Sequence, residues 1–122
     1  MTNEFDVIII GSGIAGITTA YYLEENFPSL TYKIIESRSD LGGTWDQMKF
    51  PGVRADNDMY TYGFSFNPWQ GTIIGKGHDI KKYIDQTAEK FNIKKHILFD
   101  TQVSKLSWKD SQWITKTNHK NF

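Results

Sequence analysis

The chain has 122 residues, no cysteine and a formal net charge of zero, with 14 basic and 14 acidic side chains. This length suffices for one modest domain with a hydrophobic core. The lack of cysteine excludes disulfides, thiolate metal sites and thiol nucleophiles, and zero net charge provides no overall field that favours nucleic acid or an anionic membrane.

The N-terminal residues MTNEFD lack the basic segment of a secretory signal, and the apolar run at 7–10 is too short to span a bilayer. We therefore expect a soluble cytoplasmic protein with no nucleic-acid or membrane partner. The charge is uneven: residues 1–60 carry 4 basic and 9 acidic side chains, and residues 61–122 carry 10 and 5. The late cations are all lysines, which is typical of a solvated surface; contact with a missing partner domain is the alternative.

The first elements along the chain predict a β-α-β unit. Residues 5–10 form an apolar run that we expect to be a strand buried on both faces, as parallel strands in α/β folds are. Residues 14–26 follow a helical spacing that ends before Pro28. The sequence YKIIE at 32–36 then predicts a second strand, reached by a right-handed crossover.

The remainder predicts one long helix, a third strand and a hairpin. Residues 37–77 are rich in glycine and show no clear helix. Residues 78–93 predict an amphipathic helix with Asp79 as its N-cap. Residues 96–99 predict a third parallel strand, and the alternation on both sides of Asp110-Ser111, within 101–117, predicts a β-hairpin. The apolar stripe of the helix consists of Ile80, Tyr83, Ile84, Thr87, Ala88 and Phe91.

A GxGxxG motif lies between the first strand and the first helix. Gly11 permits the tight turn out of the strand, Gly13 lets the backbone approach a pyrophosphate, and Gly16 lets helix and strand pack closely. The helix N-terminus offers free N–H groups to phosphates. Glu36 lies 20 residues beyond Gly16 at the end of the second strand, where an acidic side chain accepts hydrogen bonds from ribose hydroxyls. The predicted phosphate site consists of Gly11, Ser12, Gly13, Ile14, Ala15 and Gly16.

A second glycine pair follows the second strand. Gly42 and Gly43 leave room for a long cofactor to pass against the backbone, and Thr44 and Trp45 add a hydroxyl group and a planar face. A flexible turn is an equally good interpretation of the glycine pair from spacing alone.

The segments GSGIAG, ESRSDLGGTW and FPGVRADNDMYTYGFSF together resemble the N-terminal part of the flavin-dependent monooxygenases that include the Baeyer–Villiger and flavin-containing monooxygenases. The resemblance covers nearly the whole chain. It implies a Rossmann-like FAD-binding fold in which the glycine loop approaches the FAD phosphates and Glu36 holds the ribose. The further FAD-binding positions that it implies are Arg38, Gly43, Thr44, Trp45, Arg54, Ala55, Asp56, Tyr62 and Val103.

The resemblance also implies an activity. NADPH would reduce FAD, and the reduced flavin would add O2 to form a peroxyflavin that oxygenates a small molecule at a carbonyl, nitrogen or sulfur centre. Asp56 beside Arg54 is the best candidate for a catalytic role, since an acidic partner can orient an arginine that stabilises a peroxide anion.

The same residues have structural interpretations. Arg54 and Asp56 are also consistent with a surface ion pair. The alternation of Tyr60, Tyr62, Phe64 and Phe66 is consistent with the buried face of a strand, which could also form the wall of a flavin pocket.

Two family features are missing from the sequence. Members of the family are several times longer and carry a second GxGxxG and a Phe-x-Gly-x-x-x-His-x-x-x-Trp fingerprint, neither of which occurs here. We therefore expect residues 1–122 to be an N-terminal fragment of an FAD-binding domain, truncated before the strand that closes its sheet. Such a chain would self-associate or require the missing C-terminal part. The alternative is a non-catalytic nucleotide-binding or interaction module, either a truncated relic or one subunit of a split protein.

Overall fold

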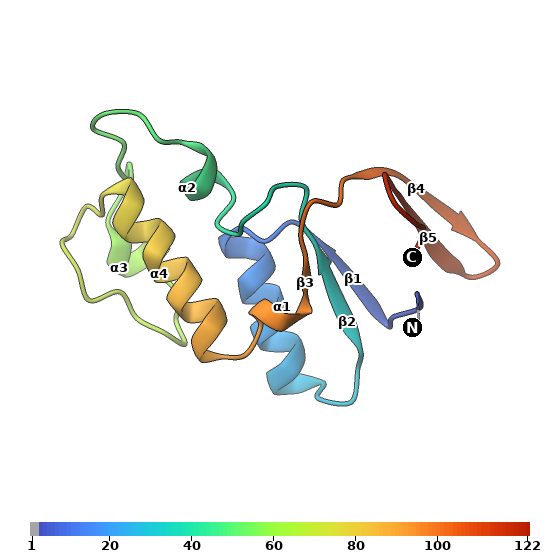
Figure 1. Ribbon diagram of the computed structural model, residues 1–122. Helices are drawn as coiled ribbons and strands as arrows, with labels where there is room; N and C mark the ends of the chain where they lie inside the picture. The colour runs from blue at the N-terminus through green and yellow to red at the C-terminus, as the bar shows by residue number, and fades with distance from the viewer. Residues whose placement is uncertain (1–2) are drawn as a thin grey trace.

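The computed structural model describes residues 3–122, so Met1 and Thr2 lie outside the described residues. Three parallel strands form a small sheet in the order β1-β2-β3, with β1 at Val7–Ile10, β2 at Tyr32–Ile35 and β3 at Ile97–Leu98. The helices lie on one side of this sheet and a β-hairpin lies on the other (Figure 1). The predicted α/β fold, with a parallel sheet and a hairpin near the C-terminus, is confirmed.

The predicted β-α-β unit is present, with α1 (Ile14–Asn26) joining β1 to β2. Ile9 of β1 pairs with Ile34 of β2 in parallel register, and both side chains belong to the hydrophobic core together with Ile17 of α1. Because parallel strands end at the same edge of a sheet, the loops that follow β1 and β2 leave the sheet side by side. This edge carries the candidate site.

The long amphipathic helix is α4 (Gly77–Lys90). Its predicted stripe is buried, from Ile80 through Ala88, and it packs over the same core. The predicted N-cap is wrong: Lys76 occupies that position, and Asp79 lies in the first turn, where a negative charge is favoured by the helix dipole. A single 3-10 turn, η1 (Lys94–His96), then leads into the short third strand.

The glycine-rich region between β2 and α4 contains two single-turn helices that the sequence did not predict, α2 (Thr44–Gln47) and α3 (Met59–Tyr62). The alternative of a strand through the alternating aromatic residues is therefore wrong. The Asp58 side chain accepts a hydrogen bond from the Thr61 backbone N–H at 2.8 Å and caps α3, which bends the chain out of extended geometry. The aromatic side chains beyond α3 instead join a cluster in which Phe66 stacks on Tyr21 of α1 at 3.7 Å between ring centroids.

The predicted hairpin consists of β4 (Val103–Lys109) and β5 (Gln112–Thr117). Its two turn residues, Asp110 and Ser111, both have positive φ angles, of 51° and 63°, as a tight two-residue hairpin turn requires. The cross-strand pair Trp108 and Trp113 lies one residue pair away from this turn, with ring centroids 5.3 Å apart.

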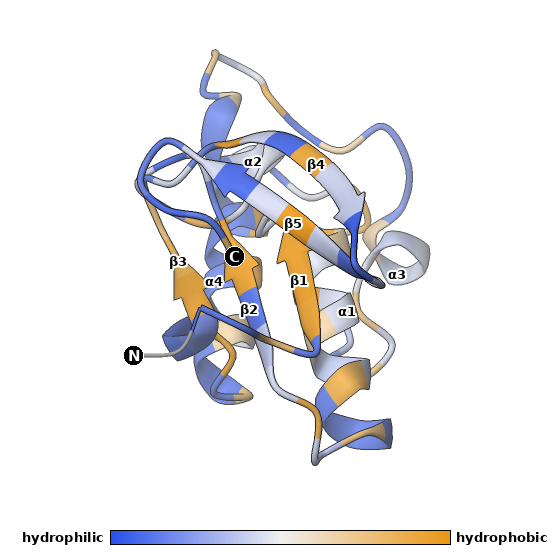
Figure 2. Ribbon diagram, turned by 90° about the vertical axis from the view of Figure 1, so that its right-hand side faces the viewer, coloured by the Kyte–Doolittle hydropathy of each residue, from blue (hydrophilic) through white to orange (hydrophobic). Residues whose placement is uncertain are grey.

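The face of β1 that looks away from the helices is open. Ile10 has 53% of its surface exposed, so the predicted burial of the first strand on both faces is wrong. Figure 2 shows the hairpin crossing in front of the parallel strands, with hydrophobic stretches of β1 and β3 left uncovered beside it. A hollow of about 660 Å³ separates the open face from the hairpin, and we call it the hairpin groove. Its apolar lining residues are Phe5, Ile8, Ile10, Leu106, Trp108, Trp113, Ile114 and Phe122.

Candidate functional site

The glycine loop has the geometry that its sequence predicts. Gly11 has a φ of +100°, a value that side-chain-bearing residues rarely adopt, and its N–H donates to the Ile35 carbonyl at 2.9 Å. A Cβ atom at Gly16 would lie 2.0 Å from the Gly11 carbonyl oxygen, so α1 packs on the loop more closely than any side chain allows. The tight turn and the close helix–strand packing are both built into the backbone.

The N-terminus of α1 has no side-chain cap within the described residues. Gly13 is its N-cap and has no side chain to accept hydrogen bonds, and no acidic residue lies in the first turn. The first N–H groups of a helix have no partner within the helix, and they carry the positive end of the helix dipole. This end of a 13-residue helix therefore has the donors and the field that a phosphate group requires.

Glu36 lies at the end of β2 beside this loop, where it is buried and forms no ion pair with a basic side chain among residues 3–122. Its Oε1 atom accepts hydrogen bonds from the Ser12 backbone N–H at 2.9 Å and from the Ser12 hydroxyl at 2.6 Å, and its Oε2 atom accepts one from the Arg38 N–H at 2.9 Å. Burial by itself would raise the pKa of this carboxyl, but the hydrogen bonds from Ser12 and Arg38 outweigh it and lower the pKa. The site therefore keeps an ionised acceptor at neutral pH.

The second glycine pair packs directly on the first glycine loop. The Gly42 N–H donates to the Ser12 carbonyl at 3.0 Å, and a Cβ at Gly43 would lie 3.1 Å from the Gly13 Cα. By contrast, a Cβ at Gly13 would make only an ordinary contact, 3.6 Å from the Gly43 Cα, and Gly13 has a φ of −75°. Nothing inside the protein therefore requires glycine at position 13, which is consistent with a ligand approaching there.

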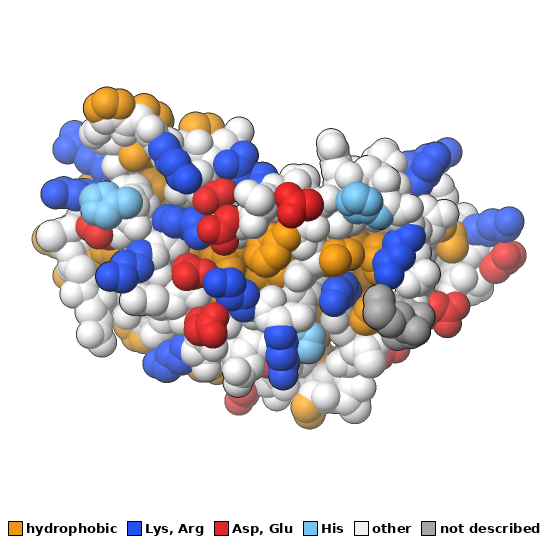
Figure 3. Space-filling view, in the orientation of Figure 1, with side chains coloured by type: hydrophobic (Ala, Val, Ile, Leu, Met, Phe, Trp, Pro, Cys, Tyr) orange, Lys and Arg blue, Asp and Glu red, His pale blue; other side chains and the backbone are white. Residues whose placement is uncertain are grey.

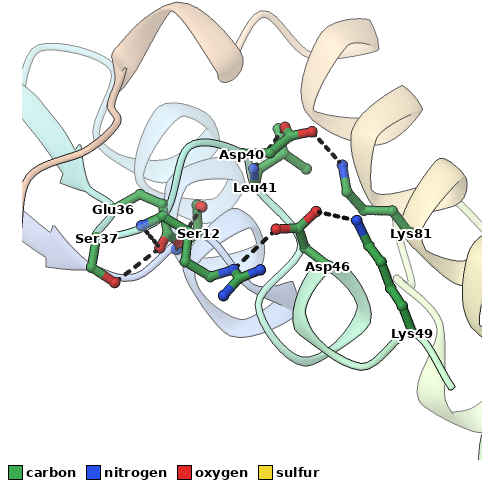
Figure 4. Close-up of polar contacts among 9 residues, drawn as sticks. Ser12, Glu36, Ser37, Asp40, Leu41, Asp46, Lys49 and Lys81 are labelled. Carbon is green, nitrogen blue, oxygen red and sulfur yellow. Dashed lines mark hydrogen bonds and ion pairs between the residues drawn. The ribbon is translucent and has the colours of Figure 1, made fainter.

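Polar contacts fasten the loop after β2 to its surroundings (Figure 4). Arg38 Nε donates to Asp46 Oδ2 at 3.0 Å, linking this loop to α2, and Lys49 lies 3.8 Å from the same carboxylate. Asp40 accepts a hydrogen bond from Lys81 of α4 at 3.1 Å. The carbonyls of Gly42 and Gly43 accept hydrogen bonds from the Trp45 and Gln47 N–H groups, at 3.1 and 3.0 Å, so the backbone holds this glycine pair in place and does not favour the interpretation as a flexible turn.

A cleft of about 330 Å³ opens beside α2, and we call it the Trp45 cleft. The Trp45 indole N–H donates to the Tyr62 hydroxyl at 3.1 Å, which joins α2 to α3 at the wall of the cleft. The cleft brings together six of the predicted site residues with three apolar neighbours. The six are Thr44, Trp45, Arg54, Ala55, Asp56 and Tyr62, and the neighbours are Met48, Phe50 and Val53.

Arg54 and Asp56 both line this cleft. They do not form an ion pair with each other, and neither belongs to any ion pair among residues 3–122. The interpretation as a surface ion pair is therefore wrong. The buried Ala55 between them donates its N–H to the Gly75 carbonyl at 2.9 Å, which fixes this extended segment against the start of α4. Both charged side chains are exposed and free to contact a ligand in the cleft.

The predicted residue Val103 lies outside both the glycine loop and the Trp45 cleft. It begins β4, but the segment before it is attached to the end of β2, because the Thr101 N–H donates to the Glu36 carbonyl at 2.9 Å. Ser12 is fully buried, so its hydroxyl group contacts Glu36 rather than solvent. Sequence reasoning missed Asp46, because its partner Arg38 is eight residues away across an irregular turn that no periodicity predicts.

No helix in the described part of the chain is long and apolar enough to cross a membrane. Nor do residues 3–122 contain a group of three or more histidine, aspartate or glutamate side chains that could hold a metal ion. Basic side chains are scattered over the face in Figure 3, with acidic side chains gathered near its middle.

Comparisons with known proteins agree with this geometry. The model of the NAD(P)-binding Rossmann-like domain family matches residues 9–73, which include both glycine loops and Glu36. The FAD-containing monooxygenase EthA of Mycolicibacterium smegmatis is 44% identical over 113 residues, which cover 92% of this chain and 23% of that protein. The resemblance to flavin-dependent monooxygenases is thereby confirmed.

Solved structures give the same result. An oxidized steroid monooxygenase bound to NADP has a TM-score of 0.88 and 27% identity, over 95% of this chain and 23% of that one. An ε-caprolactone-bound cyclohexanone monooxygenase has a TM-score of 0.85 and 26% identity, over 95% and 24%. The chain thus spans about a quarter of the length of the proteins it matches. It belongs to the NAD(P)-binding Rossmann-like domain family, in a form similar to that of the FAD-containing monooxygenases.

Proposed function

We propose that this chain is the FAD-binding portion of an NADPH-dependent flavoprotein monooxygenase that inserts oxygen into a small organic substrate. The observation that carries the proposal is the continuity of the two halves of the site. The uncapped N-terminus of α1 faces Gly43, and the residues directly after Gly43 form the wall of the Trp45 cleft. A long dinucleotide with a planar ring fits this arrangement better than a mononucleotide does.

The nucleotide half would hold ADP. The free N–H groups of α1 would bind the phosphates, and the open position at Gly13 would let the pyrophosphate approach the backbone. The ionised carboxylate of Glu36 would accept hydrogen bonds from the ribose hydroxyls, in addition to or in place of the hydroxyl of Ser12.

The Trp45 cleft would hold the flavin end. When bound, FAD supplies the oxidation chemistry, since a flavin reduced by NADPH can activate O2 and transfer one oxygen atom to a substrate. The residues of this chain would hold the flavin ring in position and place charged side chains beside it. Trp45 and Tyr62 would pack beside the planar ring, and the apolar neighbours would exclude water. Names of similar proteins support both cofactors: EthA is FAD-containing, and the steroid monooxygenase was solved bound to NADP.

Arg54 is our main candidate for a catalytic role within these residues. Its guanidinium is exposed in the cleft, so it could stabilise negative charge that develops on oxygen beside the flavin. Asp56, two residues further along the same wall, would orient the guanidinium or the nicotinamide nucleotide once ligands fill the cleft.

The direct test is reconstitution. The chain is incubated with FAD and desalted, and the absorbance spectrum of the protein fraction is recorded. We expect protein-bound flavin for the wild type and reduced retention for Glu36→Gln, with Glu25→Gln as a matched control that removes a charge from the exposed side of α1. A wild-type chain without flavin, or equal retention in both variants, would contradict the proposal.

A second candidate is a nucleotide-binding module that does not catalyse oxygenation. The observation in its favour is the single GxGxxG motif in a chain that spans about a quarter of its relatives. Retention of FAD tests the first candidate, and NADPH consumption tests whether the chain can carry out the oxygenation by itself. With FAD and NADPH in air, we expect this chain alone to show no substrate-stimulated oxidation above free flavin, because only one dinucleotide site is present in it. Steady substrate-dependent turnover would assign the whole reaction to the 122 residues.

A further inference from the structure

Asp46 carries a carboxylate for which neither the motifs nor the comparisons give a role. Only 8% of its side chain is exposed, and it lies in the first turn of α2. Its close partner is Arg38 at 3.0 Å, whereas Lys49 is 71% exposed and 3.8 Å away. An exposed partner at that distance contributes little, so the buried charge depends mainly on Arg38.

Arg38 contacts both halves of the site at once. Its backbone N–H donates to Glu36 Oε2 at 2.9 Å, and its side-chain Nε donates to Asp46 at 3.0 Å. Its carbonyl accepts a hydrogen bond from the Asp100 N–H at 3.0 Å, which holds the residue in place from a third side. The carboxylate of the nucleotide half is therefore joined to α2 through one residue.

The helix on the other side of this link is poorly held by itself. α2 has four residues and an N-cap, Gly43, whose φ of 56° is maintained without any side-chain hydrogen bond. Isolated single turns are unstable, since helix formation has a costly nucleus. Yet α2 carries Thr44 and Trp45, which form one wall of the Trp45 cleft. The position of that wall thus depends on external attachments: the Trp45–Tyr62 hydrogen bond joins α2 to α3, and the Asp46–Arg38 pair joins α2 to the loop that carries Glu36.

We propose that Asp46 is a positioning residue that, through Arg38, fixes the Trp45 cleft at the correct distance from the nucleotide half. This inference rests on the proposed function for its ligand, FAD. FAD spans both halves, whereas ADP occupies only the glycine loop and Glu36. Loss of the link should therefore weaken the binding of FAD specifically, because the two halves are no longer held in register.

The test uses Asp46→Asn, which keeps the shape of the side chain and removes its charge. We expect FAD affinity to fall about tenfold, equivalent to about 1.4 kcal/mol, while ADP affinity stays within about twofold. Asp46→Glu should restore part of the FAD affinity. The matched control is Asp40→Asn. Asp40 lies in the same loop as Arg38, and its substitution breaks the ion pair with Lys81 of α4. It should leave the ratio of FAD to ADP affinity unchanged.

Hydrogen exchange supplies a readout that needs no ligand. In Asp46→Asn the α2 amides of Trp45 and Gln47, which donate to Gly42 and Gly43, should exchange faster, while the Gly11 amide in the glycine loop keeps its protection. If the wild type binds ADP but not FAD, the proposed function fails, and the exchange result alone decides whether Asp46 holds α2. Unchanged α2 exchange, or equal losses of FAD and ADP affinity, would overturn the positioning role.

Discussion

Two parts of the chain differ in which side chains they expose. The glycine loop with Glu36 buries polar side chains that are hydrogen-bonded, whereas the hairpin with the open face of β1 exposes large apolar side chains. Around the glycine loop, Ser12 and Glu36 are buried and hydrogen-bonded to one another, and no buried side-chain N or O atom among residues 3–122 lacks a partner. Around the hairpin groove, Trp108 and Trp113 are 61% and 59% exposed. The buried polar groups of the first region find their hydrogen-bond partners within the chain. The second region exposes apolar surface of the kind that marks interaction sites.

This difference separates ligand binding from association. A site whose donors and acceptors are already fixed can bind a cofactor without large rearrangement. A hairpin groove with exposed tryptophans and an edge strand beside it favours contact with another polypeptide. Changes near the glycine loop should therefore alter folding and FAD affinity, and changes in the hairpin should alter association.

Gly16→Ala should have the largest effect. The new Cβ would lie 2.0 Å from the Gly11 carbonyl oxygen, so the helix must move away from β1. We expect a loss of about 3 kcal/mol or more in the free energy of unfolding, measured by urea denaturation. A loss below about 1 kcal/mol would show that the close packing of α1 on this loop is not a constraint.

Glu36→Gln should destabilise the chain by about 2 kcal/mol at neutral pH, through weakened hydrogen bonds to a charged acceptor. Because the pKa of Glu36 is lowered from 4.5 in the folded chain, its stabilising effect is complete above about pH 4.5 and is lost as pH falls through the lowered pKa. Unfolding measured from pH 7 to pH 3 should show wild type and variant converging in acid. A constant difference across that range would mean that the charge is not the cause.

Gly13→Ala should separate binding from folding. An alanine fits at this position within the protein, with φ at −75° and its Cβ 3.6 Å from the Gly43 Cα, so stability should change by less than about 1 kcal/mol. The methyl group would occupy the approach of the pyrophosphate, and FAD affinity should fall at least about tenfold. Paired urea denaturation and calorimetric titration would check both. Unchanged FAD affinity in a folded variant would place the phosphates elsewhere.

Trp113→Lys should have a small effect on folding and a visible effect on association. The side chain is 59% exposed, so its loss removes mainly the ring contact with Trp108, worth about 0.5–1.5 kcal/mol. We expect the wild type to self-associate in sedimentation experiments and this variant to do so less. Ile73→Lys, at a similarly exposed apolar position between α3 and α4, is the control and should leave association unchanged.

The elements with regular periodicity could be predicted from the sequence, and the irregular connections could not. The helical stripe of α4 and the two-residue hairpin turn at Asp110-Ser111 follow from local patterns. The stretch from Tyr60 to Phe66 alternates like a strand, but Asp58 caps the helical turn Met59–Tyr62, which overlaps its start, and this local hydrogen bond outweighs the alternation.

The parts of the candidate site that depend on backbone geometry could be predicted from the sequence. Gly11, Gly16 and Glu36 have the geometry that their spacing predicts, because a β-α-β unit brings the ends of β1 and β2 together. Asp46 was not predictable, since its role depends on a long-range pairing with Arg38 across an irregular loop. The exposure of Ile10 was also missed. An apolar strand predicts that both of its faces are buried, but its sequence does not show which other segment would pack on each face.

The most direct test of the central claim compares FAD with FMN by titration calorimetry on the 122-residue chain. The glycine loop and Glu36 would bind the ADP half, which FMN lacks. We predict that FAD binds at least about tenfold more tightly than FMN, and that Glu36→Gln narrows this difference. Equal affinity for the two flavins, or a difference that Glu36→Gln leaves intact, would contradict the assignment of this loop as the dinucleotide site.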